Sequence, residues 1–334
     1  MRRPLRQIVR VTIRLLCGDA LEVMRLLPDE SVQCCITSPP YWGLRDYGIE
    51  GQLGLERTPE EYVAKLVEVF REVKRVLRAD GTVWLNLGDC YNAYNGGAGP
   101  GSKLSDTQTS ERPHLETGYG LRTPALKPKD LVGIPWRVAF ALQADGWWLR
   151  SDIIWAKPNP MPESVTDRPT KAHEYLFLLA KSARYYYDAE AIREPFVYPV
   201  DASRQFKPDG WATGKGPHNS IAHYAERTGS EPTAEGGPSI HAGRNRRTVW
   251  TIPTQPFPEA HFATFPEALV EPCIAAGSRE GDTVLDPFCG SGTVGVVCAR
   301  AGRNFIGIDL NPEYVEIARR RIEGTAPLFV EVKT

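Results

Sequence analysis

The sequence predicts an α/β fold around a mostly parallel β-sheet, and three observations support this prediction. Short apolar runs of strand length, such as residues 32–36 and 283–285, alternate with amphipathic stretches of helical periodicity. Polar loops follow several of these runs, at the position where open parallel sheets bind ligands. The length of 334 residues allows one large α/β domain or a core domain with an inserted segment.

Composition and charge indicate an ordinary globular protein. The formal net charge is −1 and the pI is near 6.6, so any nucleic-acid contact must use local basic patches. Arg10 and Arg14 interrupt the apolar residues near the amino terminus, so we expect neither a signal peptide nor a membrane span, and a cytoplasmic location. The seven cysteines include adjacent Cys34 and Cys35 but no C-x-x-C pair, which favours buried, reduced thiols over disulfides or a structural metal.

The first forty residues predict a strand, a short helix and a second strand. Residues 8–16 predict the first strand, which ends before Asp19, and residues 21–27 carry apolar side chains at helical spacing. The second strand, residues 32–36, leads directly into the sequence Thr37-Ser38-Pro39-Pro40-Tyr41-Trp42. Since both strands would end at one sheet edge, we expect Asp19 and Ser38 to be near neighbours.

The proline pair has two interpretations. Prolines 39 and 40 remove two backbone donors and leave carbonyl acceptors beside the ring of Tyr41, an arrangement that could hold an amino group on a flat ring. The alternative is that the two prolines merely end a strand.

The middle of the chain predicts further helices and strands around a long polar segment. Thr58 and Pro59 begin a helix over residues 60–77, and a strand over 82–87 follows. Residues 91–123 lack apolar periodicity, which indicates either disorder or a functional flap. Next come a helix over 135–144, a strand over 148–155 that Lys157 to Pro160 break, and an antiparallel hairpin of 173–179 with 185–187.

A second polar segment, residues 195–248, is rich in Gly, Pro, Ser and His. It ends in a basic run that contains Arg244, Arg246 and Arg247. Composition alone leaves two interpretations open, an accessory segment that binds DNA and a disordered linker.

The carboxyl-terminal part contains a second diagnostic sequence. After a short strand over 249–252, a helix over 267–276 and a strand over 283–285, the glycine-rich turn DPFCGSGT (286–293) opens a helix that reaches residue 301. The turn is neither a P-loop nor G-x-G-x-x-G, so a polar ligand tail fits better than a pyrophosphate. The next strand, 305–308, ends at Asp309, a position from which a carboxylate can accept both hydroxyls of a ribose. Asn311 caps the helix that follows.

The motifs TSPPYW and DPFCGSGT, together with GIDLNPEYVEIARRR after the latter, resemble the S-adenosylmethionine-dependent amino methyltransferases of DNA. The resemblance covers about residues 8–190 and 249–325, and its motif order is similar to that of the β class. It implies a circularly permuted, Rossmann-like methyltransferase fold with a mostly parallel seven-stranded sheet and a terminal antiparallel hairpin. Residues 1–190 would form the catalytic half, with a flap at about 91–123, 191–248 a target-recognition segment, and 249–334 the cofactor half.

The resemblance also implies roles for individual residues. The catalytic residues would be Ser38, Pro39, Pro40 and Tyr41. S-adenosylmethionine would contact Asp19, Ala20, Thr264, Phe265, Pro266, Asp286, Pro287, Phe288, Gly290, Ser291, Gly292, Thr293, Asp309, Leu310 and Asn311. The target base and DNA would contact Trp42, Lys157, Arg244, Arg246 and Arg247. The segment His173-Glu174-Tyr175 would mainly build the floor of the target-base pocket. For His173 itself, a core position and a catalytic role both stay open.

The implied reaction is a direct methyl transfer to an exocyclic amine of a flipped-out base, without a covalent enzyme intermediate. Ser38 and the Pro39 carbonyl would accept the amine hydrogens, Tyr41 would stack on the base and Trp42 would form a wall. Ser38 at the first motif position favours cytosine N4, with adenine N6 as the alternative; a catalytically silent DNA-binding module and methylation of RNA or protein amines are further alternatives. The expected partners are double-stranded DNA, a second copy of the chain and a cognate restriction endonuclease.

Overall fold

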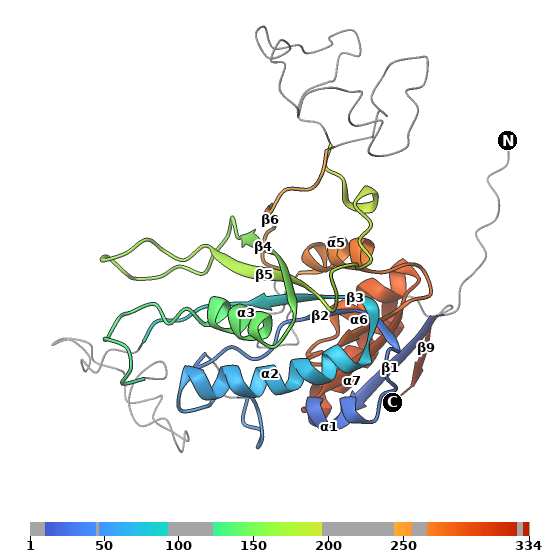
Figure 1. Ribbon diagram of the computed structural model, residues 1–334, viewed down its shortest axis with the longest axis horizontal. Coiled ribbons are helices and arrows are strands. Elements are labelled where there is room, and N and C mark those ends of the chain that lie inside the picture. The colour runs from blue at the N-terminus through green and yellow to red at the C-terminus, as the bar shows by residue number, and fades with distance from the viewer. Residues whose placement is uncertain are drawn as a thin grey trace, which may run out of the picture. The chain divides into compact units, whose positions relative to one another are not determined.

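The computed structural model describes residues 11–44, 47–92, 123–195, 244–255, 266–325 and 330–333. The chain divides into two compact units, Met1–Asp188 with Arg247–Thr334, and Ala189–Arg246. In the second unit the described residues form a short 3-10 helix, η1 (Glu190–Ile192), and an isolated antiparallel bridge between Glu194 and Arg244. The first unit contains the sheet and the helices (Figure 1).

Nine strands form one sheet in the described part of the first unit (Figure 1). They are β1 (Val11–Cys17), β2 (Val32–Thr37), β3 (Leu77–Leu87), β4 (Trp148–Ala156), β5 (His173–Ala180), β6 (Val249–Thr251), β7 (Thr283–Asp286), β8 (Asn304–Asp309) and β9 (Val330–Lys333). The order along the sheet is β6-β4-β5-β3-β2-β7-β8-β1-β9, and β5 alone of these strands is antiparallel to its neighbours. The predicted mostly parallel α/β fold is therefore confirmed.

Two details of the predicted sheet differ from the structure. In the part of the chain that the structure describes, the sheet has nine strands instead of the predicted seven, because the short strands β6 and β9 add one strand at each edge. The predicted hairpin partner of β5, residues 185–187, is not a strand, and β5 pairs instead with β3 and β4. The physical reason is packing, since the ring of Tyr186 lies against the Arg279 guanidinium and Tyr187 stacks on Trp84.

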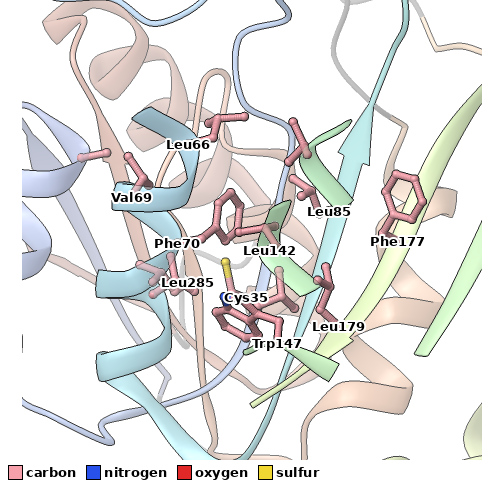
Figure 2. Close-up of a cluster of buried hydrophobic side chains, with 14 of the residues drawn as sticks. Cys35, Leu66, Val69, Phe70, Leu85, Leu142, Trp147, Phe177, Leu179 and Leu285 are labelled. Carbon is pink, nitrogen blue, oxygen red and sulfur yellow. The ribbon is translucent and has the colours of Figure 1, made fainter. Parts of the chain in front are cut away.

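Helices cover both faces of the sheet. They are α1 (Ala20–Arg25), α2 (Pro59–Val76), α3 (Ile134–Ala144), α5 (Glu267–Gly277), α6 (Thr293–Ala301) and α7 (Pro312–Thr325). The core between α1, α2, α3 and the sheet contains the apolar face of α2, and Figure 2 shows Leu66 and Phe70 of this helix near Leu85 of β3 and Leu142 of α3. Thr58 caps α2 as predicted, since its hydroxyl accepts a hydrogen bond from the Glu61 amide at 3.1 Å.

Alternation along β2 sends its two adjacent cysteines to opposite faces of the sheet. Cys35 lies in the core of Figure 2, whereas Cys34 lies against Gly277 of α5, where an added Cβ would be 2.7 Å from the Cys34 sulfur. All seven cysteines are described and all are free thiols; five are buried, whereas Cys90 is half-buried and Cys17 is exposed, so the predicted burial is wrong for Cys17. Within the described ranges, no helix has the length and apolarity needed to cross a membrane.

Strand pairing brings the two sequence motifs together. Strand β2, which leads into TSPPYW, pairs in parallel with β7, which leads into DPFCGSGT. In contrast, β7 and β8 separate β2 from β1, so Asp19 and Ser38 follow strands that are about 14 Å apart at the usual spacing. The prediction that Asp19 and Ser38 are near neighbours is therefore wrong.

Candidate active site

A cavity of about 1330 Å³ opens at the carboxyl ends of the parallel strands. Its wall is built from residues at or after the ends of β1, β2, β3, β4, β6, β7 and β8, together with the start of β5 and part of α2. It lies wholly within the first unit, and it is large enough for two small ligands side by side because typical ligand pockets measure about 300–1,000 Å³.

Most of the predicted site residues line this cavity. They are Asp19, Ala20, Ser38, Pro39, Pro40, Tyr41, Lys157, Pro287, Phe288, Gly290, Ser291, Thr293, Asp309, Leu310 and Asn311. Asp19 and Ser38 thus border one cavity although their strands are not adjacent.

Other predicted residues lie elsewhere. Asp286 is buried at the end of β7, Gly292 packs against Ala318 of α7, and Pro266 is the N-cap residue of α5. Thr264 and Phe265 fall outside the described residues, as do 93–122 of the predicted flap and 196–243 of the predicted recognition segment. Arg244 forms an ion pair with Glu194 and lies with Arg246 in the second unit, whereas Arg247 is exposed in the first.

The predicted role of Trp42 as a wall of the base pocket needs correction. Trp42 is only 1% exposed and belongs to the hydrophobic core. Its indole N–H donates to the carbonyl oxygen of Glu56 at 2.9 Å, and the Glu56 carboxylate in turn accepts from the Gly54 amide at 2.8 Å. Burial of the large apolar indole ring is favourable once its N–H has a hydrogen-bond partner. Trp42 therefore anchors this loop and does not border the cavity.

The side chains of Ser38 and Tyr41 belong to one hydrogen-bond network. The Tyr41 hydroxyl lies 2.8 Å from Glu174 Oε2 and 3.0 Å from Asn86 Oδ1, and Ser38 Oγ lies 3.3 Å from the same Asn86 oxygen. The Asn86 amide is oriented by its Nδ2, which donates to the Tyr175 carbonyl at 3.1 Å. Burial, followed by the charge of Glu174, raises the pKa of Tyr41 well above its ordinary value, so the phenol keeps its proton.

The number of protons in this network determines what Ser38 can do. Tyr41 has one proton, and the carboxylate of Glu174 is a stronger acceptor than the amide oxygen of Asn86. The Ser38 hydroxyl then donates to Asn86 or to Tyr41, and no described residue donates to the Ser38 oxygen in return. The lone pairs of Ser38 Oγ are therefore available to a ligand in the cavity.

The two proline carbonyls of the motif differ in their partners. The Pro40 carbonyl accepts a hydrogen bond from the Tyr62 hydroxyl at 2.8 Å. No described residue donates to the Pro39 carbonyl, although Pro39 lines the cavity. Ser38 and Pro39 thus provide two adjacent free acceptors, as expected from the sequence.

Lys157 is committed to a partner inside the protein. Its ammonium group forms an ion pair with Glu174 and lies 4.2 Å from the centre of the Trp155 ring. Both charged side chains are less than one-fifth exposed, at 18% and 17%. Lys157 lines the cavity, and its charge neutralises Glu174 rather than standing free for a phosphate, so its contact with the target base or DNA stays a prediction.

The glycine-rich turn is tied to the other motif through Asp286. The hydroxyl of Thr37 donates to Asp286 Oδ1 at 2.7 Å, and the Phe288 amide donates to the same oxygen at 3.1 Å. Asp286 is 1% exposed, and burial raises its pKa to about 7. The carboxylate thus holds the turn in place.

Glycine is required at one position of this turn. Gly292 has φ +77°, and a Cβ atom there would lie 2.7 Å from the Cβ of Ala318 in α7. Any other residue at position 292 would bring its Cβ too close to α7, so only glycine allows the turn to pack this closely against the helix.

Asp309 and Asp19 are two carboxylates on the cavity wall. Asp309 accepts from the Gly290 amide at Oδ2 and from the Asn311 amide at Oδ1, both at 2.8 Å, and each oxygen keeps one lone pair for a ligand. Burial raises the pKa of Asp309 above its ordinary value. Asp19 caps α1 with Oδ1 alone, at 2.9 Å from the Leu21 amide and 3.0 Å from the Glu22 amide.

Many cavity residues were not among the predicted site residues, and Asn86, Glu174, Lys171 and Asp89 are four polar examples. Asn86 could have been found from the sequence, because it is a polar residue in the otherwise apolar strand WLNL. Glu174 belongs to the segment that the family resemblance assigns to the floor of the base pocket, although it was not named as a site residue. Lys171 and Asp89 have no such signal, since their position depends on the pairing of β3 with β5 and on the β4–β5 loop. His173 lines the cavity and its ring lies edge-on to Tyr175 at 5.3 Å, so a place in the cavity wall is shown and a catalytic role is not.

The sequence matches the N6/N4 methyltransferase family, described as DNA methylase, over residues 32–320. It is 51% identical over 308 residues to the type II methyltransferase M.Cfr9I of Citrobacter freundii, covering 92% of this chain and 86% of that protein. It is 46% identical over 310 residues to M.SmaI of Serratia marcescens, covering 92% and 90%.

Two solved structures show the same fold. One is a Thermus thermophilus protein, described as a putative DNA modification methylase and complexed with S-adenosyl-L-methionine. It has a TM-score of 0.56 and 24% identity, covering 96% of this chain and 100% of that chain. The other is the PvuII DNA methyltransferase, described as cytosine-N4-specific, with a TM-score of 0.58 and 19% identity over 93% and 88%.

Proposed function

The chain belongs to the DNA methylase family, and we propose that it transfers a methyl group from S-adenosylmethionine to the N4 amine of cytosine in double-stranded DNA. One observation supports this proposal most. The free acceptors of Ser38 and Pro39 and the carboxylate of Asp309 line the same cavity, although they come from opposite ends of the chain. A methyl donor and an acceptor amine could therefore meet there.

The cavity wall fits the family's cofactor. When bound, S-adenosylmethionine supplies a methyl group on a positively charged sulfur. The two free lone pairs of Asp309 match a pair of ribose hydroxyls, and the backbone of residues 287–293 would hold the methionine part. Asp19 uses only one carboxylate oxygen in capping α1, so its second oxygen could accept a hydrogen bond from an adenine amino group.

The motif residues would prepare the amine for reaction. The lone pair of an exocyclic amine is delocalised into the ring, which makes the nitrogen a weak nucleophile. Ser38 Oγ and the Pro39 carbonyl would accept one amine hydrogen each, shift the nitrogen towards tetrahedral geometry and direct its lone pair into the cavity. Asn86 would keep the Ser38 oxygen in this orientation by accepting the serine proton.

Tyr41 would provide the stacking surface for the base. Its hydroxyl is held by Glu174 and Asn86, and Gly88 leaves room for the ring, since a Cβ at residue 88 would lie 2.5 Å from it. Stacking on an aromatic ring contributes about 1–3 kcal/mol per base. A base within a duplex cannot reach such a cavity, so we propose that the target nucleotide is flipped out.

The reaction needs no enzyme nucleophile. Cys289 is the cavity cysteine among the described residues, and burial raises the pKa of its thiol well above the ordinary value. A protonated thiol is a poor nucleophile, so Cys289 supports direct displacement rather than a covalent intermediate.

Ser38 supports cytosine as the target base. A serine hydroxyl is a weaker acceptor than a carboxylate, and the family resemblance associates serine at this position with cytosine. Adenine N6 is the alternative target, with the same acceptors and the same cavity.

Residues 191–248, including Arg244, Arg246 and Arg247, and the flap at 91–123 are our candidates for sequence recognition. Residues 1–190 and 249–334 would act as the catalytic and cofactor halves of one methyltransferase domain. The similarity to type II methyltransferases supports a cognate restriction endonuclease, and a homodimer is a prediction of the resemblance.

The test is incubation of the protein with radiolabelled S-adenosylmethionine and mixed-sequence duplex DNA, followed by nucleoside analysis and mapping of the methylated site. We expect label on N4-methylcytosine. Label on adenine would transfer the proposal to the N6 amine. If calorimetry shows cofactor binding but no DNA, single- or double-stranded, accepts label, the chain is a silent cofactor-binding module or methylates another amine.

A further inference from the structure

The loop between β4 and β5 presents an exposed apolar side chain at the cavity. This loop, residues 157–172, starts at the carboxyl end of β4, the sheet edge where the cavity opens. Met161 lines the cavity, yet it is 84% exposed. Of the large, exposed apolar side chains in the described ranges, Met161 and the less exposed Leu44, at 56%, border the cavity.

The backbone around Met161 is restrained. Pro160 and Pro162 fix the φ angles on both sides of Met161 and have no backbone N–H, so the Met161 amide is the one backbone donor of these three residues. Asn159 exchanges two hydrogen bonds with Thr254, from the Thr254 amide to Asn159 Oδ1 at 2.9 Å and from Asn159 Nδ2 to the Thr254 carbonyl at 3.4 Å. Met161 is therefore held at the cavity, and it is not the tip of a freely moving loop.

The chemistry of this position identifies its occupant. Flipping a base leaves a gap in the duplex directly above the cavity that receives the base, and apolar side chains such as Met and Pro are those that enter base steps. Methionine is unbranched and polarisable, so it fits the irregular space between two aromatic bases. A side chain that stays 84% exposed without DNA would become buried there.

We propose, on the basis of the proposed function, that Met161 with its flanking prolines enters the duplex at the target position and occupies the space that the flipped nucleotide leaves. Met161 thereby stabilises the extrahelical state. It has no part in the chemical step or in cofactor binding, which use residues deeper in the cavity.

The experiment uses a duplex that carries the mapped methylation site once. Two forms of this duplex are compared: in the first the target base is paired normally, and in the second the target base lies opposite an abasic position. Single-turnover methylation is measured for the wild-type protein, Met161→Ala, Met161→Leu and Leu26→Ala. Leu26 is the matched control, because it is also 84% exposed but lies at the end of α1 and does not border the cavity. Calorimetric titration with S-adenosylmethionine accompanies each variant.

On the paired duplex at subsaturating DNA, we expect methylation by Met161→Ala to be about tenfold slower than by the wild type. The reason is that alanine buries much less apolar surface in the complex than methionine does. On the abasic duplex, where no pairing opposes flipping, its rate should be within about threefold of the wild type. Met161→Leu and Leu26→Ala should match the wild type on both duplexes, and all variants should bind the cofactor equally.

The proposal is overturned if Met161→Ala matches the wild type on the paired duplex, loses the same factor on both duplexes, or loses cofactor affinity. Methylation of neither duplex by the wild-type protein would instead contradict the proposed function, so the two failures are distinguishable.

Discussion

Replacement of Thr37 with valine tests the bond that joins the two sequence motifs. Valine has the shape of threonine, so the buried site keeps its packing while Asp286 loses the hydroxyl donor at 2.7 Å. A hydrogen bond to a charged group contributes about 1.5–3 kcal/mol and one between neutral groups about 1 kcal/mol. The cost of Thr37→Val should therefore depend on whether Asp286 is ionised.

The pH range of this effect follows from the pKa of Asp286. Its pKa in the folded protein is about 7, above the ordinary 3.8, because burial opposes ionisation. The stability that this group contributes is therefore fully present below pH ~4 and is lost as the pH rises through ~7, by about 4 kcal/mol in total. At pH 5 Asp286 is protonated in the fold, and at pH 8.5 it is ionised.

The assay is urea unfolding of the wild type and Thr37→Val at pH 5 and pH 8.5, without ligand. We expect the variant to lose about 1 kcal/mol at pH 5 and about 2–3 kcal/mol at pH 8.5. Comparison with the wild type at each pH cancels the other titrating groups. In an Asp286→Asn background the cost of Thr37→Val should be equal at both pH values, and an equal cost in the wild-type background would refute the reasoning.

Three further predictions concern the cavity and the glycine turn. Asp309→Ala should raise the cofactor Kd by about 10–100-fold, measured by calorimetry, whereas Ser38→Ala should leave the Kd unchanged and lower kcat. Tyr41→Phe keeps the stacking ring but removes the hydroxyl held by Glu174 and Asn86, so single-turnover methylation should be about tenfold slower at unchanged cofactor affinity. Gly292→Ala should destabilise the fold in urea by about 1–3 kcal/mol more than Gly281→Ala, because both glycines have positive φ but only the former contacts Ala318.

Each of these predictions has a contradicting outcome. An equal loss of cofactor affinity in Asp309→Ala and Ser38→Ala would show that the two residues do not have separate roles. Full activity of Tyr41→Phe would remove the hydroxyl network from the mechanism. Equal destabilisation at Gly292 and Gly281 would mean that α7 can move to admit a methyl group.

Local patterns in the sequence were sufficient to predict most elements. Apolar periodicity identified α2 and its buried face, and the Thr58 and Asn311 side chains cap α2 and α7 as expected. These features depend on residues within a few positions of one another, so the sequence contains their full cause. The position of Trp42 could not be predicted in this way, because an aromatic residue after a strand can face either a ligand or the core. The hydrogen bond from its indole N–H to the Glu56 carbonyl, formed only in the folded loop, shows that Trp42 faces the core.

The sequence by itself determined the two motifs, their residue types and the strands that carry them. The tertiary structure decided which strands are neighbours, because alternation along a strand specifies the buried face and not the partner. It placed β2 beside β7 and joined Thr37 to Asp286 across 249 positions, and it separated β1 from β2 by the two strands β7 and β8. It also brought Asn86 and Glu174 to Tyr41 through the pairing of β3 with β5, a long-range contact that no local pattern encodes.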